Sequence, residues 1–162
     1  MSESPDNSLQ PSKWADADFE SLSWHDCTVH SIGLDQNAGE YQCDLLLDLD
    51  FLVEWILVGD GTLQFRVAPA LLRFCGVDKL AIHTRLDYMQ PMQISEVTRS
   101  RRDEPGQTNY HWTIKLHTYP GRENQIEFDA LCFSQQLTGR TVVTGRQSLS
   151  SAERRELIRT CG

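Results

Sequence analysis

The sequence predicts a mainly β protein, an antiparallel β-sandwich or a partly open barrel that ends in a short C-terminal helix. Apolar and polar residues alternate along several segments, and turn residues separate these segments at short intervals. The 162 residues, 40% hydrophobic and 23% charged, suffice for one domain with a sizeable core. The longest apolar run is too short to span a bilayer, so we expect no membrane segment.

The N-terminal part is predicted to be a polar arm followed by aromatic anchors. Residues 1–13 hold two prolines and little to bury, which predicts a disordered arm. Residues 14–162 are expected to form a single β-rich domain, beginning with a loop or one helical turn over 14–22. Residues 24–34 are rich in β-branched and aromatic types and predict a strand, and 35–39 predict a turn.

The clearest strand begins at Tyr41. Every second residue as far as Phe51 is apolar, and most positions between are polar or acidic. A helical stripe through residues 45–56 is the alternative interpretation, but the turn before the segment favours the strand. We interpret the acidic residues as a solvated strand face that protects the sheet against edge pairing: Asp44, Asp48, Asp50 and Glu54.

Further strands are predicted at regular intervals. Alanine and proline at 68–70 are expected to separate two of them, because proline cannot donate a hydrogen bond to a β-ladder. Ser150 and Glu153 have the spacing of a capping box, which predicts a short helix that ends near Arg159. The predicted strands cover residues 62–67, 71–75, 79–86, 94–101, 110–118 and 125–133.

The charge of the chain is unevenly distributed. Residues 1–60 hold 13 acidic residues and one basic residue, whereas residues 61–162 hold 10 acidic and 14 basic residues, and the net charge is −8. An acidic protein repels the phosphate backbone, so we expect no nucleic-acid partner. The split allows an acidic surface that faces a basic protein partner, although solubility alone also favours acidic residues.

The cysteines and the N-terminus predict a reducing, cytoplasmic location. The chain has no C-x-x-C pair, and its first residues contain neither a basic start nor an apolar leader segment. Most of the cysteines have apolar neighbours and are expected to be small buried side chains. The five are Cys27, Cys43, Cys75, Cys132 and Cys161.

The most distinctive local cluster runs from Trp24 to Cys27. On a strand, neighbouring side chains point to opposite sides, so His25 and Asp26 are not expected to act as one pair. His30 lies four residues from Asp26, too far for direct contact. Two interpretations remain: a polar pocket in which Asp26 orients a histidine for acid–base chemistry, or an anchor in which Trp24 packs and Asp26 caps backbone amides.

No metal, cofactor or catalytic residue is assigned from the sequence. His111 and His117 lie six residues apart on one strand, roughly 20 Å, and cannot bind one ion together. The acidic row lacks the spacing of a calcium loop. The chain contains neither a G-x-S-x-G motif nor a phosphate-binding glycine loop. The histidines weighed for a zinc site are His25, His30, His83, His111 and His117.

Several segments carry a family resemblance. Residues 23–31, 45–50, 54–55 and 67–74 resemble a group of small uncharacterised bacterial proteins. More loosely, the W-H-D start followed by a β-meander is similar to an immunity-protein family encoded beside bacterial polymorphic toxins. The resemblance implies a bacterial source and a mainly β fold, and it supplies no active-site residues.

We therefore expect a non-enzymatic, immunity-like binding module that engages a protein partner, with no membrane partner. One alternative is a small-ligand or lipid carrier in a β-barrel, with Trp24, His25 and Trp55 near its rim. Another is a hydrolase that uses Asp26 and a histidine. An exposed edge strand would also permit a homodimer. The candidate binding residues are Trp24, His25, Asp26, His30, Asp48, Asp50, Glu54 and Trp55.

Overall fold

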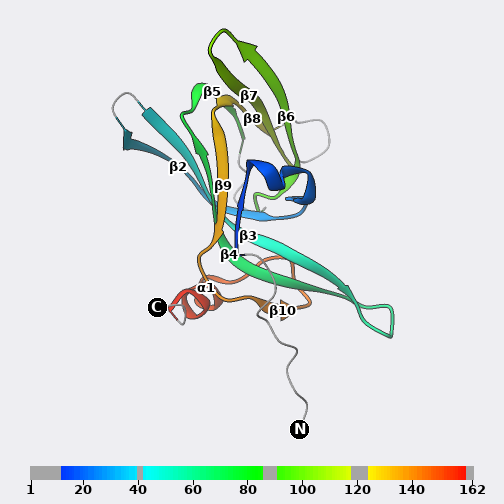
Figure 1. The fold of residues 1–162 in the computed structure, drawn as a ribbon. Helices are drawn as coiled ribbons and strands as arrows, with labels where there is room; N and C mark the ends of the chain where they lie inside the picture. Colours follow the sequence, from blue (N-terminus) through cyan, green and yellow to red (C-terminus); the bar gives the residue numbers. More distant parts are fainter. Residues whose placement is uncertain (1–11, 40–41, 86–90, 118–123, 160–162) are drawn as a thin grey trace.

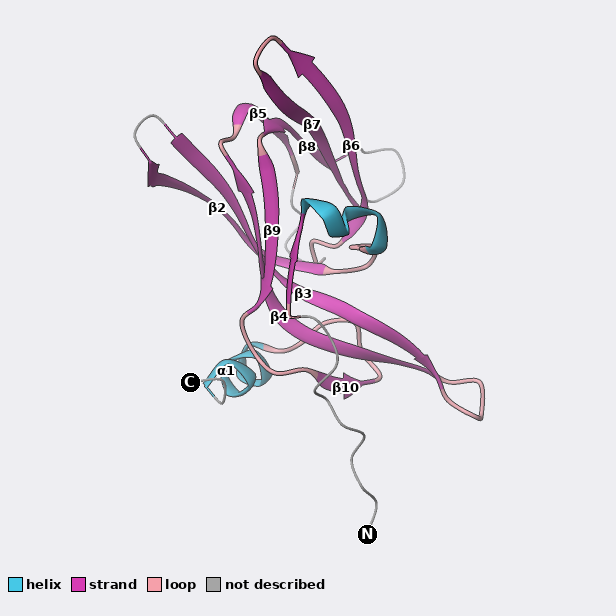
Figure 2. Cartoon of the chain, viewed as in Figure 1, coloured by secondary structure: helices cyan, strands magenta, loops and turns pink. Residues whose placement is uncertain are grey.

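Two antiparallel sheets form the protein, as the computed structural model shows for residues 12–39, 42–85, 91–117 and 124–159 (Figures 1 and 2). The first sheet has the order β1-β9-β4-β3-β2, and β10 also pairs with β4; the second has the order β5-β8-β7-β6. This arrangement confirms the predicted mainly β sandwich. The first sheet contains β1 (Lys13–Ala15), β2 (Thr28–Gly39), β3 (Gln42–Leu57), β4 (Leu63–Cys75), β9 (Cys132–Leu137) and β10 (Val142–Thr144). The second contains β5 (Asp78–His83), β6 (Ile94–Glu104), β7 (Gln107–Leu116) and β8 (Asn124–Ala130).

The core lies between the two sheets. The alternating leucines of β3 are fully buried, as the sequence pattern predicts. Across the interface, the ring centroid of Phe74 in the first sheet lies 4.8 Å from that of Trp112 and 4.8 Å from that of Phe128 in the second. These edge-on contacts between aromatic rings join the sheets at their centre.

Three boundaries near the N-terminus differ from the prediction. Lys13 belongs to β1 and pairs with Gln136 of β9, so the predicted arm is too long by at least this residue, and residues 1–11 lie outside the described part. The predicted helical turn is the 3-10 helix η1 (Asp16–Ser21). Residues 24–27 form a turn rather than the start of a strand, and β2 continues through the predicted turn to Gly39.

Pro69 does not break a strand, contrary to the prediction. It lies inside β4 and faces Asp50 of β3. The oxygen of Pro69 accepts a hydrogen bond from Thr138 N at 2.8 Å, where the chain leaves β9. The N and O of a strand residue point to the same side, so the missing N–H donor faces the gap between β9 and β10 and costs no ladder bond.

The last third of the chain contributes strands to both sheets. The predicted strand over 125–133 is two strands separated by Leu131: β8 in the second sheet and β9 in the first. β10, which the sequence analysis did not predict, pairs with β4. The helix α1 (Ser151–Arg159) confirms the predicted capping box, since Ser150 N donates to Glu153 Oε2 at 2.7 Å and Glu153 N donates to Ser150 Oγ at 3.2 Å. Within the described residues, no helix has both the length and the apolar character needed to cross a membrane.

Candidate functional site

The eight candidate binding residues fall into three separate groups. Trp24, His25 and Asp26 lie in the turn before β2, His30 and two aspartates join a buried ionic network, and Glu54 and Trp55 lie toward the far end of the β3–β4 hairpin. The structure therefore does not gather them into one pocket. Each group has its own geometry and its own chemistry.

Trp24 is a structural anchor. Its side chain is buried, its indole N–H donates to Gln135 Oε1 at 2.7 Å, and its ring packs against Phe19 and Phe133. This part of the anchor interpretation is confirmed. Only 3% of Trp24 is exposed, so a ligand at the surface could make little contact with its ring. The expectation that Trp24 lines a binding rim is wrong.

His25 and Asp26 form a pair, contrary to the prediction. Cys27 N donates to Trp24 O at 3.0 Å and closes a tight turn, and Asp26 has a φ of 65° in the left-handed region. The turn removes the strand alternation that would separate the two side chains. His25 Nδ1 consequently lies 3.1 Å from Asp26 Oδ2. The turn is fixed to β6, because Asp26 N donates to Ile94 O at 2.8 Å.

A second histidine reaches the same carboxylate from the end of β7. His117 Nε2 lies 3.0 Å from Asp26 Oδ1, and Gln147 Nε2 donates to Asp26 Oδ2 at 3.1 Å. Gln93 links the turn at Asp26 to the end of β7. Its backbone oxygen accepts a hydrogen bond from His117 N at 2.7 Å, and its side-chain Nε2 donates to the backbone oxygen of Asp26 at 3.5 Å. The side chain of Asp26 thus contacts other side chains, and the predicted capping of backbone amides is wrong. We call His25, Asp26 and His117 the turn cluster.

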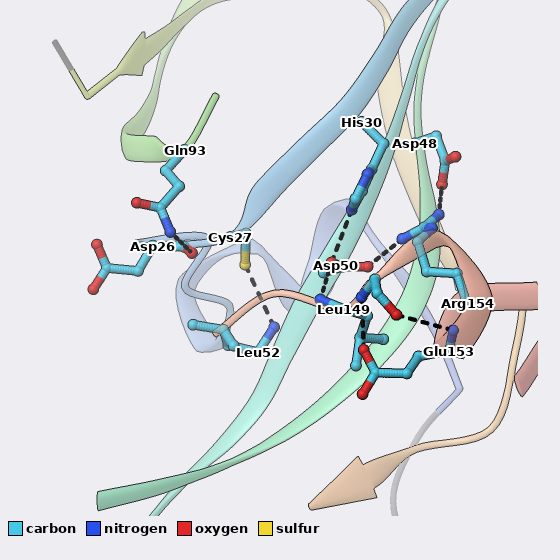
Figure 3. A network of polar contacts seen from close by, with 11 residues as sticks. Asp26, Cys27, His30, Asp48, Asp50, Leu52, Gln93, Leu149, Glu153 and Arg154 are labelled. Carbon is cyan, nitrogen blue, oxygen red and sulfur yellow. Dashed lines mark hydrogen bonds and ion pairs between the residues drawn. The ribbon is translucent and has the colours of Figure 1, made fainter. Parts of the chain in front are cut away.

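Asp50 is the centre of a buried polar network (Figure 3). The carboxylate is 0% exposed and accepts hydrogen bonds from Arg154 Nη1 and from Leu149 N, the latter at 2.8 Å. His30 Nε2 lies 2.8 Å from the same carboxylate, and Arg154 also binds Asp48. The network joins β2 and β3 to α1. Figure 3 shows the Asp26 side chain pointing away from it.

The acidic row of β3 is therefore not a solvated face, and this prediction is wrong. Asp44 and Asp50 are buried, and Arg73 Nη1 donates to Asp44 Oδ2 at 2.7 Å. Glu54 lies farther along and is exposed, but it accepts a hydrogen bond from Arg66 Nε at 3.0 Å. A partner would find no free surface on Asp50.

The uneven charge along the chain is explained in large part by pairing within the fold. Acidic residues from the first 60 positions form ion pairs with arginines from the remaining positions. Most of these arginines lie on strands, and one lies on the C-terminal helix. Each pair neutralises an acidic side chain within the fold, so these carboxylates present less charge to a partner than the sequence alone indicates. The pairs are Asp16–Arg99, Asp35–Arg73, Asp44–Arg73, Asp48–Arg154, Asp50–Arg154 and Glu54–Arg66.

Asp129 in β8 forms a further polar cluster, which no sequence pattern indicated. Its carboxylate contacts His111 Nδ1 at 2.7 Å, Arg102 at 3.2 Å and Lys79 at 3.3 Å. Burial raises the pKa of Asp129, but the hydrogen bonds from His111 and Lys79 and the charge of Arg102 outweigh it and hold the pKa below its usual value. The cluster keeps Asp129 ionised inside the second sheet. His111 thus contacts Asp129 and His117 contacts Asp26, so the two histidines belong to separate clusters.

The far end of the β3–β4 hairpin carries an exposed apolar patch. Trp55 is 48% exposed, Leu57 71% and Leu63 45%, and Val58 is exposed beside them. Trp55 pairs with Phe65 across the ladder, and Leu57 pairs with Leu63. We call Trp55, Leu57, Val58 and Leu63 the hairpin end. Among the described residues, nine large apolar side chains are exposed, and four of them lie here.

A cavity of about 390 Å³ opens beside the hairpin end. Trp55 forms one wall, and Trp14, Leu22 and Phe51 contribute apolar surface. Neither Trp24 nor His25 belongs to the lining, so the predicted rim of three residues is reduced to Trp55. The volume suits one large side chain of a partner or a small ligand.

Sequence reasoning missed the residues that complete each group. His117 was considered among five candidate zinc ligands but not as a partner of Asp26. Gln147 and Arg154 carry no local signal because they lie more than 100 residues from their partners. The apolar run around Gly59 could have indicated Leu57, Val58 and Leu63, since three large apolar residues flank a turn at which little can cover them.

Comparison of the chain with protein-family models, curated proteins and solved structures gives no match.

Proposed function

We propose that this protein is a non-enzymatic binding module that docks a protein partner through the hairpin end. The observation that supports the proposal is the exposure of Trp55, Leu57, Val58 and Leu63 together at one extremity of the fold. These side chains are 38–71% exposed, so burying the rest of each in an interface would contribute part of the roughly 1.5–3 kcal/mol that complete burial contributes. Tryptophan is also one of the residue types enriched among the energetic hot spots of interfaces.

The shape of the hairpin supports docking. In Figure 1 the paired strands β3 and β4 extend away from the second sheet and end in the turn around Gly61. The side chain of Trp55 meets Phe65 edge-on, with ring centroids 5.2 Å apart, which orients the indole without covering it. A partner could therefore contact the hairpin end and insert one side chain into the adjoining cavity.

The charge of the protein indicates the chemistry of the partner. The net charge is −8, which attracts a basic protein over long range even though many acids are paired. Near the turn, hydrogen bonds from Thr62 lower the pKa of Asp60, so this carboxylate is ionised beside the apolar patch. The expected partner segment has an apolar anchor flanked by lysine or arginine. A bacterial, cytoplasmic, immunity-like role in which the partner is a basic toxin domain fits this chemistry and is part of the proposal.

Selection from a random peptide library tests the proposal without a known partner. Peptides displayed on phage are selected on the wild-type chain and counter-selected on a Trp55→Ser/Leu57→Ser double variant. We expect enrichment of peptides with an apolar anchor next to basic residues, and at least tenfold weaker binding of these peptides to the double variant.

Leu34→Ser is the matched control, because Leu34 is an equally exposed apolar residue on the other long hairpin, β2–β3. It should leave peptide binding unchanged. Enriched peptides that bind the double variant as tightly as the wild type, or that lose binding in Leu34→Ser instead, would refute docking at the hairpin end.

A small-ligand carrier is the second candidate, favoured by the cavity beside Trp55. Fatty acids and similar apolar molecules would then change the fluorescence of Trp55 and compete with the selected peptides. A panel of such lipids that produces neither effect rejects the carrier.

A further inference from the structure

The turn cluster places three metal-ligating groups around one point. A donor atom from each of His25, Asp26 and His117 lies within 4.8 Å of the other two. Asp26 stands between the imidazoles, 3.1 Å from His25 Nδ1 and 3.0 Å from His117 Nε2. Ligands at about 2.0–2.2 Å from a tetrahedral zinc ion are themselves separated by roughly 3.3 Å. The two separations from Asp26 are close to this value, whereas the three donor atoms together span up to 4.8 Å, so the imidazoles would have to move closer together to bind one ion.

The backbone holds this arrangement in place. Asp26 is one of two non-glycine residues with a positive φ among the described residues. Aspartate adopts this left-handed conformation more readily than most residues, so the turn can place its side chain here without a glycine. Hydrogen bonds from Asp26 N to Ile94 O, 2.8 Å, and from His117 N to Gln93 O, 2.7 Å, tie both ligand segments to the same stretch of chain.

Gln147 supplies the kind of outer contact that metal-ligating carboxylates have. Its amide nitrogen donates to Asp26 Oδ2 at 3.1 Å and orients the carboxylate toward the imidazoles. The side chains of His25 and His117 are 55% and 42% exposed. An ion could therefore enter from solvent, and water could complete its coordination.

We propose that His25, Asp26 and His117 bind one first-row divalent cation of the zinc type. Two imidazoles and one carboxylate are the nitrogen and oxygen ligands that such ions prefer. Three protein ligands leave the fourth coordination position to water, as in open zinc sites. The inference does not rest on the proposed protein partner.

Isothermal titration with zinc chloride on the full chain, after dialysis against a chelator, tests the site. We expect one zinc per chain. His25→Ala and His117→Ala should each weaken binding at least tenfold, and Gln147→Ala about tenfold. Asp26→Asn is the informative fourth variant, because asparagine tolerates a positive φ and keeps the turn while it removes the charge. Its circular dichroism spectrum should match the wild type while zinc binding falls.

Two controls separate this site from other sources of zinc binding. His83→Ala removes an exposed histidine outside the cluster and should leave the affinity unchanged. Cobalt in place of zinc should give a spectrum without thiolate charge-transfer absorption, which excludes the cysteines as ligands. No zinc binding, binding that survives in both histidine variants, or a thiolate spectrum would overturn the proposal and leave the turn cluster as polar contacts of Asp26 with two histidines.

Discussion

The guanidinium of Arg154 binds the carboxylate of Asp50, so the C-terminal helix is joined by a charge pair to the middle of β3 (Figure 3). Asp50 is fully buried and Arg154 is nearly so. Removing one partner of such a pair leaves the other charge buried without compensation. This contact shows why the apparent acidic surface of the sequence became part of the interior.

Arg154→Ala should therefore lower the free energy of unfolding by about 3–5 kcal/mol. Arg155→Ala, the neighbouring exposed arginine, should change it by no more than about 0.5 kcal/mol. Urea denaturation followed by circular dichroism measures both. Equal effects of the two substitutions would show that the Asp50 network does not hold the helix.

A glycine comparison tests the turn between β4 and β5. Gly76 has a φ of +61°, and a Cβ there would lie 2.8 Å from Leu131 Cδ1. We expect Gly76→Ala to destabilise the fold by about 1–3 kcal/mol. At Gly33 a Cβ would meet nothing within 4 Å, so Gly33→Ala should be neutral or stabilising by up to about 1 kcal/mol. Thermal unfolding of both variants gives the comparison, and equal melting temperatures would contradict it.

The Asp129 cluster predicts acid sensitivity. Folding lowers the pKa of Asp129 below its usual value of 3.8. The ionised carboxylate therefore contributes fully to stability above the unfolded-state pKa, and this contribution is lost as the pH falls through the folded-state pKa. Asp129→Asn lacks this contribution. The difference in unfolding free energy between wild type and variant should shrink between about pH 5 and pH 2. A difference that stays constant over this range would contradict the assignment.

The thiols should differ in reactivity. Burial raises the pKa of Cys27 to about 12, and burial together with a hydrogen bond to Cys132 raises that of Cys75 to about 12. The thiolate is the reactive form. Iodoacetamide at about pH 8 should therefore modify Cys43 of the native chain faster than either, and urea should abolish the difference. Peptide mass spectrometry provides the rates. Modification of native Cys27 as fast as in urea would refute its burial.

The sequence predicted the fold class because burial with a period of two is a local signal. The leucines of β3 and the residues Trp112, Ile114 and Leu116 of β7 are buried as their alternation indicates. The strand break predicted at Pro69 was wrong, because the effect of the missing N–H donor depends on which strand lies beside the proline. The division at Leu131 was also hidden, because a chain that passes from one sheet to the other keeps a continuous strand pattern.

The candidate site could be predicted only in part. His25 and Asp26 were identified, but the turn that brings them together depends on a single positive φ, and their partner His117 lies 91 residues from Asp26. The acidic residues of β3 were assigned to the surface because alternation identifies two faces of a strand without showing what covers each. Arg154, which covers one of them, comes from a helix 104 residues from Asp50.

If a partner docks on the hairpin end, the indole N–H signals of the four tryptophans should respond unequally. Trp24 and Trp112 are buried and Trp14 nearly so, whereas Trp55 is open to a partner. In a proton–nitrogen correlation NMR spectrum, with the Trp55 signal assigned from Trp55→Phe, titration with a selected basic, apolar peptide should shift that signal most and leave those of Trp24 and Trp112 in place. Saturable binding that leaves the Trp55 signal unmoved would contradict docking at the hairpin end.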